Sequence, residues 1–393
     1  MSSAAAHDVV RTAEPFTGGG CAEGARASFD AVQQAVGALE SEAGLVLFFP
    51  TGIDPAQAVA DAQAAAGDAL VAGMTGSGAI AAGGAIATGC SALAFSAAVP
   101  VGIGTAAAPD PRAAGRAAAE EALACVDAAN GCPLLLLFVD SESGDQGEIV
   151  AGAYDVAGGH VPLAGGAAGG AAGAQFANGN ALSDSVVAVA IVPSAPVGVG
   201  IAHACVPRGT PSIVTRSTGR TILHLDGRPA ATVYLEKLGL DGVELSEADF
   251  DAVALVHPLA EPELNGDVRP RYVRTRVPGG GLVCASRMDP NAALDICDQA
   301  PEAIVTSARQ AVGDAVRQLP GPVDAALLFD CAARSPQFGN PLAAREIDSI
   351  ISSFRPPPRC LAGVYTRGEI GRARGAKGDR NHSVVIVAFS SAD

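Results

Sequence analysis

Several short segments of the chain are apolar on every side, and they constrain the fold more than any other feature. GLVLFF (44–49), PLLLLFVD (133–140) and DAALLFD (324–330) have the length and composition of buried strands. Such strands are typical of sheets covered by helices or by a second layer. Helical patterns lie between them, among them 28–42 and 112–128. The sequence therefore predicts an α/β fold.

Longer β patterns at 185–206 and 221–226 favour α/β units with mixed sheets (α+β in part) over a purely parallel, doubly wound sheet. The 393 residues are enough for two domains, each with its own core. Asp226-Gly227-Arg228-Pro229 has turn composition, and a new helical pattern follows it. We expect a flexible leader at 1–27, one αβ domain at 28–230 and a second at 231–393.

The charge and the cysteines limit the partners and the compartment. The formal charge is −16, and aromatic residues make up 4% of the chain. A negative field repels phosphate backbones and few rings are present to stack on bases, so we do not expect nucleic acid as a partner. The 9 cysteines show no C-x-x-C pair, which favours free thiols in a reducing compartment.

The uncharged stretch 69–109 is the one candidate for a membrane span. It consists largely of Gly, Ala, Ser and Thr, contains Pro100, and has no flanking basic residues. A spanning helix needs stronger apolarity and a basic side. The first residues also lack the pattern of a signal peptide. We expect no membrane insertion and a cytoplasmic location.

Nucleotide-binding motifs are weak. Gly76-Ser77-Gly78-Ala79-Ile80-Ala81 fits a dinucleotide loop in its glycines, but no acidic residue follows at the spacing that a ribose contact needs. Lys237 and Lys377 are the only lysines, and neither lies in a phosphate-binding loop. We therefore predict no nucleotide cofactor and interpret the glycines as a tight turn.

The histidines lack the spacing of a zinc site, so we predict no metal centre. Haem needs only one protein ligand, and His203, His160 and His257 are the candidates for an axial position. Core or surface histidines are the simpler interpretation. His382, which follows Asn381 before the last apolar segment, is expected on the surface or at the mouth of a cleft.

Two segments near the end of the chain could carry chemistry. Cys331 ends a predicted strand, where α/β sheets bind ligands, and Arg334 could lower its pKa; a buried, inert cysteine is the alternative. Farther on, Tyr365, Arg367 and Glu369 alternate, so we expect them on one face of an extended segment. An Arg and a carboxylate beside backbone amides suit a zwitterionic or carboxylate ligand, although a structural Arg–Glu pair would give the same pattern.

These segments resemble the C-terminal half of FIST domains. The resemblance rests on FDCAAR (329–334) and GVYTRGEIG (363–371), with Glu346 between them and Asn381-His382 after them. RYVRTRV (271–277) and GGLVCAS also match the family's pattern. Upstream, ALVAGMTGSGAI, VPLAGGAAG and PSIVTRSTGRTILHLDGRPAATVY are similar to its N-terminal half. Met74, Thr75 and Ala79 depart from the Cys, Ser and Glu that the family pattern has there.

The resemblance covers about residues 28–390 and implies a sensory module that binds a small molecule such as an amino acid. It implies that Gly165 and Gly166 line a pocket of the first half, and Tyr365, Gly368 and Glu369 one of the second. Arg334, Arg367 and His382 complete the expected ligand-binding set. FIST domains often adjoin output modules in one polypeptide. Because the resemblance takes up the chain, we expect a separate signalling partner.

Three hypotheses remain open at this point. The first is a small-molecule sensor that has no cofactor. The second is a haem protein, because some FIST relatives carry haem and respond to nitric oxide. The third is an enzyme that uses Cys331 on the same scaffold, which we favour less because no recognisable catalytic set accompanies it.

Overall fold

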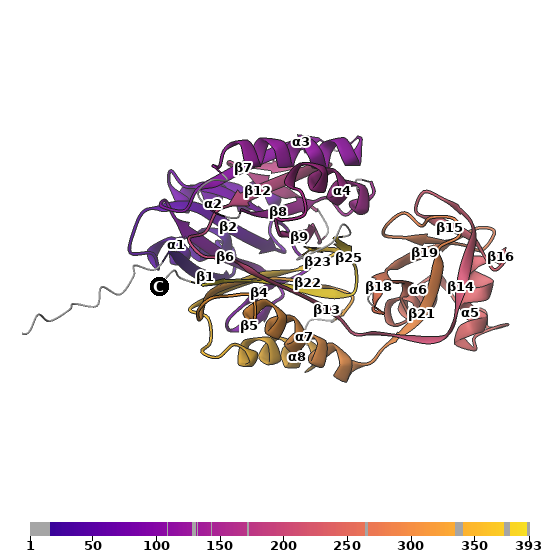
Figure 1. Cartoon of the computed structure of the whole chain (residues 1–393). Coiled ribbons are helices and arrows are strands. Elements are labelled where there is room, and N and C mark those ends of the chain that lie inside the picture. Colours follow the sequence, from indigo (N-terminus) through magenta and orange to yellow (C-terminus); the bar gives the residue numbers. More distant parts are fainter. Residues whose placement is uncertain are drawn as a thin grey trace, which may run out of the picture.

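The computed structural model describes residues 16–107, 109–127, 131, 133–142, 144–170, 173–263, 266–334, 341–372 and 378–390. They form a body (16–204 and 300–390) and a lobe (205–299), which lies at the right of Figure 1.

The body contains three sheets of six strands that share one strand order. The first sheet consists of β1 (Thr17–Glu23), β6 (Gly89–Ser96), β2 (Ala43–Thr51), β3 (Leu70–Met74), β10 (Gln175–Ala177) and β11 (Asn180–Leu182). The second consists of β7 (Val101–Ala107), β12 (Ser185–Ile191), β8 (Leu134–Val139), β9 (Leu163–Ala167), β24 (Glu369–Arg372) and β25 (Asp379–Arg380). The third consists of β13 (Gly198–His203), β26 (Ser383–Ser390), β22 (Val323–Cys331), β23 (Cys360–Thr366), β4 (Ala79–Ala81) and β5 (Gly84–Ile86).

This common order arises because the chain builds the same unit three times. Each unit begins with a strand, a helix, a strand, a helix and a strand, in that order. The second and third of these strands pair in parallel: β2 with β3, β8 with β9, and β22 with β23. A hairpin then crosses to a neighbouring sheet, and a last strand returns to the unit's own sheet. The hairpins are exchanged cyclically: β4–β5 joins the third sheet, β10–β11 the first, and β24–β25 the second.

A pair of helices covers the outer face of each sheet (Figure 1). The pairs are α1 (Ala27–Gly37) with α2 (Pro55–Ala66), α3 (Pro111–Ala124) with α4 (Gln146–Ala157), and α7 (Pro301–Val316) with α8 (Pro341–Ser353). Local signals start these helices. Asp54 caps α2 by accepting a hydrogen bond from Gln57 N, and Pro55 takes the first helical position.

The inner faces of the three sheets enclose one apolar core. Phe49 of β2, Phe138 of β8 and Phe329 of β22 meet there, one ring from each sheet. Their ring centroids lie 6.0 Å (Phe49–Phe138), 5.9 Å (Phe49–Phe329) and 6.2 Å (Phe138–Phe329) apart. The strands are apolar on both faces because one face meets this core and the other meets a helix pair.

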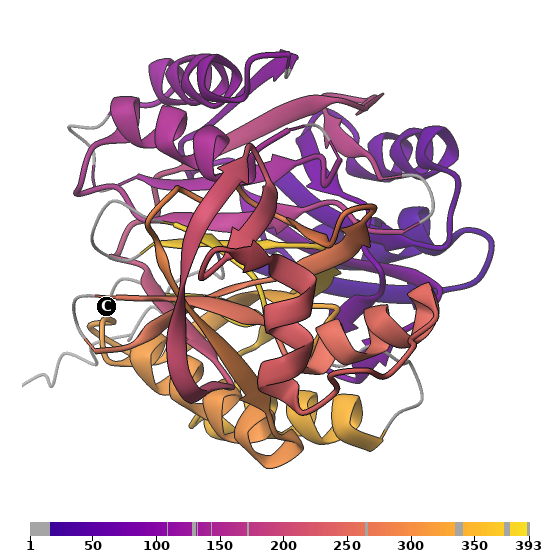
Figure 2. The same cartoon turned by 90° about the vertical axis from the view of Figure 1, so that its right-hand side faces the viewer.

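The lobe is an insertion into the third unit, between β13 and α7. Its strands are β18 (Val268–Arg271), β17 (Leu259–Pro262), β21 (Ala293–Gln299), β14 (Cys205–Thr218), β15 (Thr221–Leu225), β20 (Gly281–Cys284), β19 (Val273–Val277) and β16 (Arg228–Pro229). Two helices, α5 (Ala230–Leu238) and α6 (Glu247–Val256), pack on them around a separate core that contains Tyr234 and Phe250. Figure 2 views the molecule with the lobe in front of the body.

The α/β class with mixed sheets is confirmed. The prediction of a flexible leader at 1–27 was wrong for residues 17–23, because Thr17–Glu23 forms β1 and pairs along its whole length with β6. Residues 1–15 of this predicted leader lie outside the described residues. The expected division at 230/231 does not separate the sheets, since strands from both sides of it share three of them. In the described part of the chain, no helix has both the length and the apolarity needed to cross a membrane.

Candidate functional site

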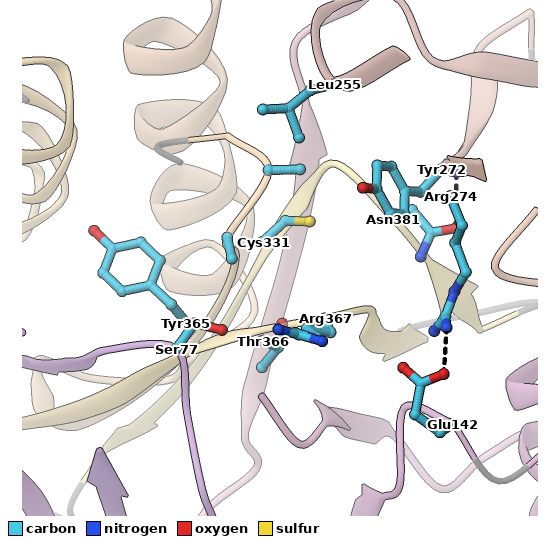
Figure 3. Close-up of a pocket in the computed structure, with 12 residues that line it drawn as sticks. Ser77, Glu142, Leu255, Tyr272, Arg274, Cys331, Tyr365, Thr366, Arg367 and Asn381 are labelled. Atoms are coloured by element: carbon cyan, nitrogen blue, oxygen red, sulfur yellow. Dashed lines mark hydrogen bonds and ion pairs between the residues drawn. The ribbon is translucent and has the colours of Figure 1, made fainter. Parts of the chain in front are cut away.

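A cavity of about 520 Å³ lies between the body and the lobe. It opens at the carboxyl ends of the parallel strands β22 and β23, where α/β sheets commonly bind ligands. Its lobe wall consists of Leu255, Tyr272 and Arg274, and its body wall of Ser77, Glu142, Cys331, Ala332, Ala333, Tyr365, Thr366, Arg367 and Asn381 (Figure 3).

The threefold construction of the body places this site. After β3, β9 and β23 the three loops meet, and an N–H of each donates to a carbonyl of another: Ser77 N to Tyr365 O (2.9 Å), Gly169 N to Thr75 O (3.0 Å) and Arg367 N to Ala167 O (3.1 Å). Ser77, Gly169 and Arg367 are thus equivalent positions of the three units. Only the third unit places a charge there.

Arg367 is the residue best placed to bind an anion. Its side chain is exposed to the cavity, and its guanidinium has no ion-pair partner among the residues that the structure describes. Tyr272 lies near enough for this charge to act on its phenol: burial raises the pKa of Tyr272, and Arg367 opposes the rise. As far as the described residues show, the cavity thus offers a cation without an ion-pair partner, beside hydroxyl and amide groups.

One ion pair bridges the two walls of the cavity. Arg274 of the lobe lies 2.7 Å from Glu142 of the body and also donates to Ser141 O at 2.6 Å (Figure 3). Glu142 is 64% exposed, so water screens this pair.

Cys331 points its sulfur into the cavity (Figure 3), but its surroundings hold the thiol protonated. Burial and the carboxylate of Glu369 raise the pKa of Cys331 well above its usual range, and the thiol donates a hydrogen bond to that carboxylate. Arg334 was expected to lower the pKa of Cys331, but the pKa of this thiol is raised. A nucleophilic cysteine needs a lowered pKa, so this geometry does not favour the enzyme hypothesis.

Arg334 is buried behind the cavity wall and its charge is already compensated. It pairs with Asp330 at 3.1 Å and with Glu346 at 2.5 Å. It also donates to Ile304 O and Ser307 Oγ, each at 3.1 Å. Burial and the nearby Glu346 carboxylate raise the pKa of Asp330. Arg334 therefore ties the end of β22 to α7 and α8, and it is not placed to reach a ligand in the cavity.

Tyr365, Arg367 and Glu369 do not share one face, so that expectation was wrong. β23 ends at Thr366, and β24 begins at Glu369 in a different sheet. The ring of Tyr365 points away from the cavity into the core under α7 and α8 (Figure 3). Glu369 is fully buried and accepts hydrogen bonds from Thr366 Oγ1 (2.7 Å) and Ser383 N (3.2 Å).

The expected glycines serve strand packing. A Cβ on Gly165 would lie 2.0 Å from Leu137 O, and one on Gly166 would lie 2.7 Å from Thr366 Cγ2. Gly368 has a φ of +151°, and a Cβ there would lie 2.4 Å from Gln146 Oε1. These three positions allow β9 and the turn after Arg367 to approach their neighbours closely.

No histidine of the described residues lines the cavity, although the ring of His382 packs against that of the lining residue Tyr272. His382 is buried, not exposed as expected; burial and Arg334 lower its pKa to about 3, and its Nδ1 lies 3.2 Å from Gln299 Oε1. His203 uses both ring nitrogens, towards Asp267 (3.0 Å) and Cys205 N (3.2 Å). His257 Nδ1 lies 2.9 Å from Asp298, and His160 is exposed. The residues present therefore do not fit an axial haem ligand at this cavity.

Nine lining residues were missed as site residues: Ser77, Glu142, Leu255, Tyr272, Arg274, Ala332, Ala333, Thr366 and Asn381. RYVRTRV held a usable signal, because Tyr272 and Arg274 alternate along an extended segment and so share a face. The sequence held no comparable signal for Glu142, because its ion-pair partner, Arg274, is more than a hundred residues away in the chain.

The fold and the cavity define a two-part α/β protein with a site of small-molecule size. Comparison with family models matches the FIST N domain to residues 44–228 and the FIST C domain to residues 230–372. The chain belongs to the FIST family, whose domains are generally sensory, ligand-binding signalling domains. A search of curated proteins found no match.

Glu369 gives a pH-dependent prediction. Burial raises its pKa from the ordinary 4.5 to about 7. The folded state therefore holds this proton more tightly than the unfolded chain. Ionisation then costs stability progressively as the pH rises from 4.5 to 7, by about 3 kcal/mol in total. Urea unfolding across this range should show that the unmodified protein loses stability as the pH rises. The free energy of unfolding of Glu369→Gln, relative to that of the unmodified protein, should therefore increase with pH. A constant difference would contradict the buried, raised-pKa carboxyl.

Proposed function

We propose that the chain is a small-molecule sensor that binds a carboxylate-bearing ligand, such as an amino acid, in the cavity between body and lobe. The single observation that carries the proposal is Arg367, a guanidinium that faces the cavity without an ion-pair partner among the described residues. A carboxylate accepts two parallel N–H bonds from such a group.

Other lining groups fit the rest of an amino acid. The Glu142 carboxylate can attract an ammonium group, and Tyr272, Ser77 and Asn381 offer neutral hydrogen-bonding groups. Leu255, Ala332 and Ala333 leave apolar wall for a side chain. Because the family is sensory, we also propose that occupancy of the cavity is reported to a separate signalling protein.

Thermal unfolding with each standard amino acid and a set of small dicarboxylates tests the ligand class. A ligand at 100 times its Kd should stabilise the protein by about 2.7 kcal/mol. Arg367→Gln should then weaken the binding of any ligand found about 10- to 150-fold, because a hydrogen bond to a charged group contributes about 1.5–3 kcal/mol. Titration calorimetry measures the change.

Arg116→Gln is the control, since Arg116 is an exposed arginine of α3 that pairs only with Glu120 in the described structure. It should leave affinity unchanged. Absence of stabilisation by every compound would exclude the proposed ligand class, and unaltered affinity in Arg367→Gln would exclude the proposed anchor.

A further inference from the structure

We propose that the lobe is a hinged lid over the cavity and that the Arg274–Glu142 ion pair is a latch that contributes to holding it closed. This inference rests on the proposed function, because the lid would control access to the same cavity. The latch itself can be tested without any ligand.

The first support is the way in which the lobe is attached. In the first two units the opening strand leads directly to its helix, whereas in the third the lobe interrupts this connection. The chain enters the lobe at Ala204 and leaves it at Ala300, and these two crossings are adjacent because Cys205 pairs with Gln299. No lobe strand belongs to a body sheet in the described residues. Two neighbouring single-residue crossings form a hinge that can turn without breaking a sheet.

The second support is the composition of the interface. Each apolar cluster of the described residues lies wholly within the body or wholly within the lobe. The described residues make hydrogen bonds and ion pairs across the interface, and the ring of Tyr272 contacts that of His382. Interfaces of this kind between two parts of a chain permit relative motion, because no shared apolar core has to be opened.

The third support is the order of the contacts along the segment 267–274 of the lobe, which runs through β18 into β19. Nearest the hinge, Asp267 contacts His203 at 3.0 Å. Arg269 and Arg271 then bind Asp379 of the body, at 2.8 and 2.7 Å, in a buried group that also includes Glu261. Arg274 and Glu142 come last. Arg274 lies beyond the passage from β18 into β19, so along this segment the latch is the contact farthest in sequence from Asp267.

The latch is weak enough to open and placed to control access. A solvent-screened pair of this kind holds its partners only loosely. Both of its residues line the cavity, and so does Cys331, which is 4% exposed with the lobe in place. The reactivity of this thiol therefore reports how often the lid opens.

The experiment measures alkylation of each cysteine by N-ethylmaleimide in the full chain, followed by peptide mass spectrometry. Glu142→Gln and Arg274→Gln should each increase the rate at Cys331 about two- to fivefold, the factor that an exposed ion pair is worth. Cys90, fully buried in the first sheet, should keep its rate, because only global unfolding exposes it. The charge reversal Glu142→Arg with Arg274→Glu should bring the rate at Cys331 back towards that of the unmodified protein.

A matched control lies within the lobe. Arg276 pairs with Glu247 at 2.9 Å, and the two side chains are 25% and 64% exposed, close to the 20% and 64% of Arg274 and Glu142. Glu247→Gln should leave Cys331 unaffected. An unchanged rate in both latch variants, or a parallel rise at Cys90, would overturn the lid.

A second arm adds a mixture of the standard amino acids to the unmodified protein. If the mixture stabilises the protein and slows alkylation of Cys331, a ligand favours the closed lid. If the latch variants behave as expected but the mixture has neither effect, the lid stands and the proposed ligand class fails. If the mixture stabilises the protein while the latch variants label normally, the ligand class stands and the lid fails.

Discussion

Arg334→Gln should lower the free energy of unfolding by about 3–5 kcal/mol, because it leaves the buried carboxyl groups of Asp330 and Glu346 without their common cation. The side chains of all three residues are fully buried, so water cannot replace the lost charge. The substitution also removes donors to Ile304 O and Ser307 Oγ. Equilibrium unfolding in urea at pH 7 measures the loss.

Arg345→Gln provides the comparison on the same helix, α8. Arg345 pairs with Glu302 at 2.7 Å, but the two side chains are 51% and 76% exposed. An exposed pair contributes about 0–1 kcal/mol, so this variant should unfold almost as the unmodified protein does. Equal losses in the two variants would contradict a structural role for Arg334 and would return it to the candidate ligand-binding residues.

Gly165→Ala should lower the free energy of unfolding by about 2–5 kcal/mol or prevent folding. A Cβ there would lie 2.0 Å from Leu137 O, inside the parallel pair of β8 and β9, and φ is +134°. Overpacking costs about 1–3 kcal/mol and an unfavourable positive φ about 1–2 kcal/mol more. Thermal and urea unfolding give the result.

Gly37→Ala is its control, because Gly37 ends α1 and a Cβ there would meet nothing within 4 Å. Alanine favours a helix over glycine by about 1 kcal/mol, so this variant should be as stable as the unmodified protein or more so. If Gly165→Ala instead folds normally and loses only ligand binding, Gly165 lines a pocket after all and the packing role is refuted.

Sequence patterns predicted much of the alternation of strands and helices, because the central strands β2, β8 and β22 show continuous apolar runs and several helices carry their own caps. The threefold construction was missed, although VAG (71–73), LAG (163–165) and LAG (361–363) mark it. In each, the glycine faces a carbonyl of the neighbouring parallel strand: Phe48 O, Leu137 O and Leu328 O. The repeat was hidden because the lobe separates the first strand of the third unit from the rest.

The candidate site was predicted in part. Arg367 was expected to bind a ligand and does face the cavity, since the glycine after it permits a sharp turn. Tyr365 and Glu369 were expected beside it, but the chain changes sheets at this turn. The Tyr365 ring packs into the core under α7 and α8, and the Glu369 carboxyl is buried against Thr366 and Ser383. The pairing of Arg274 with Glu142 depends on how the lobe folds back over the body, which no local pattern encodes.

The cyclic exchange of hairpins has a consequence for the protein during its synthesis. The hairpin β4–β5 pairs with β23. Ala81 pairs with Ala362, which is synthesised about 280 residues later. At about 5–20 residues per second, a ribosome needs roughly 15–60 s to supply that partner. During this interval the edge of an apolar hairpin remains unpaired on the nascent chain. We expect the newly made protein to depend on chaperones that shield such edges, and fragments cut between residues 228 and 230 to aggregate rather than fold.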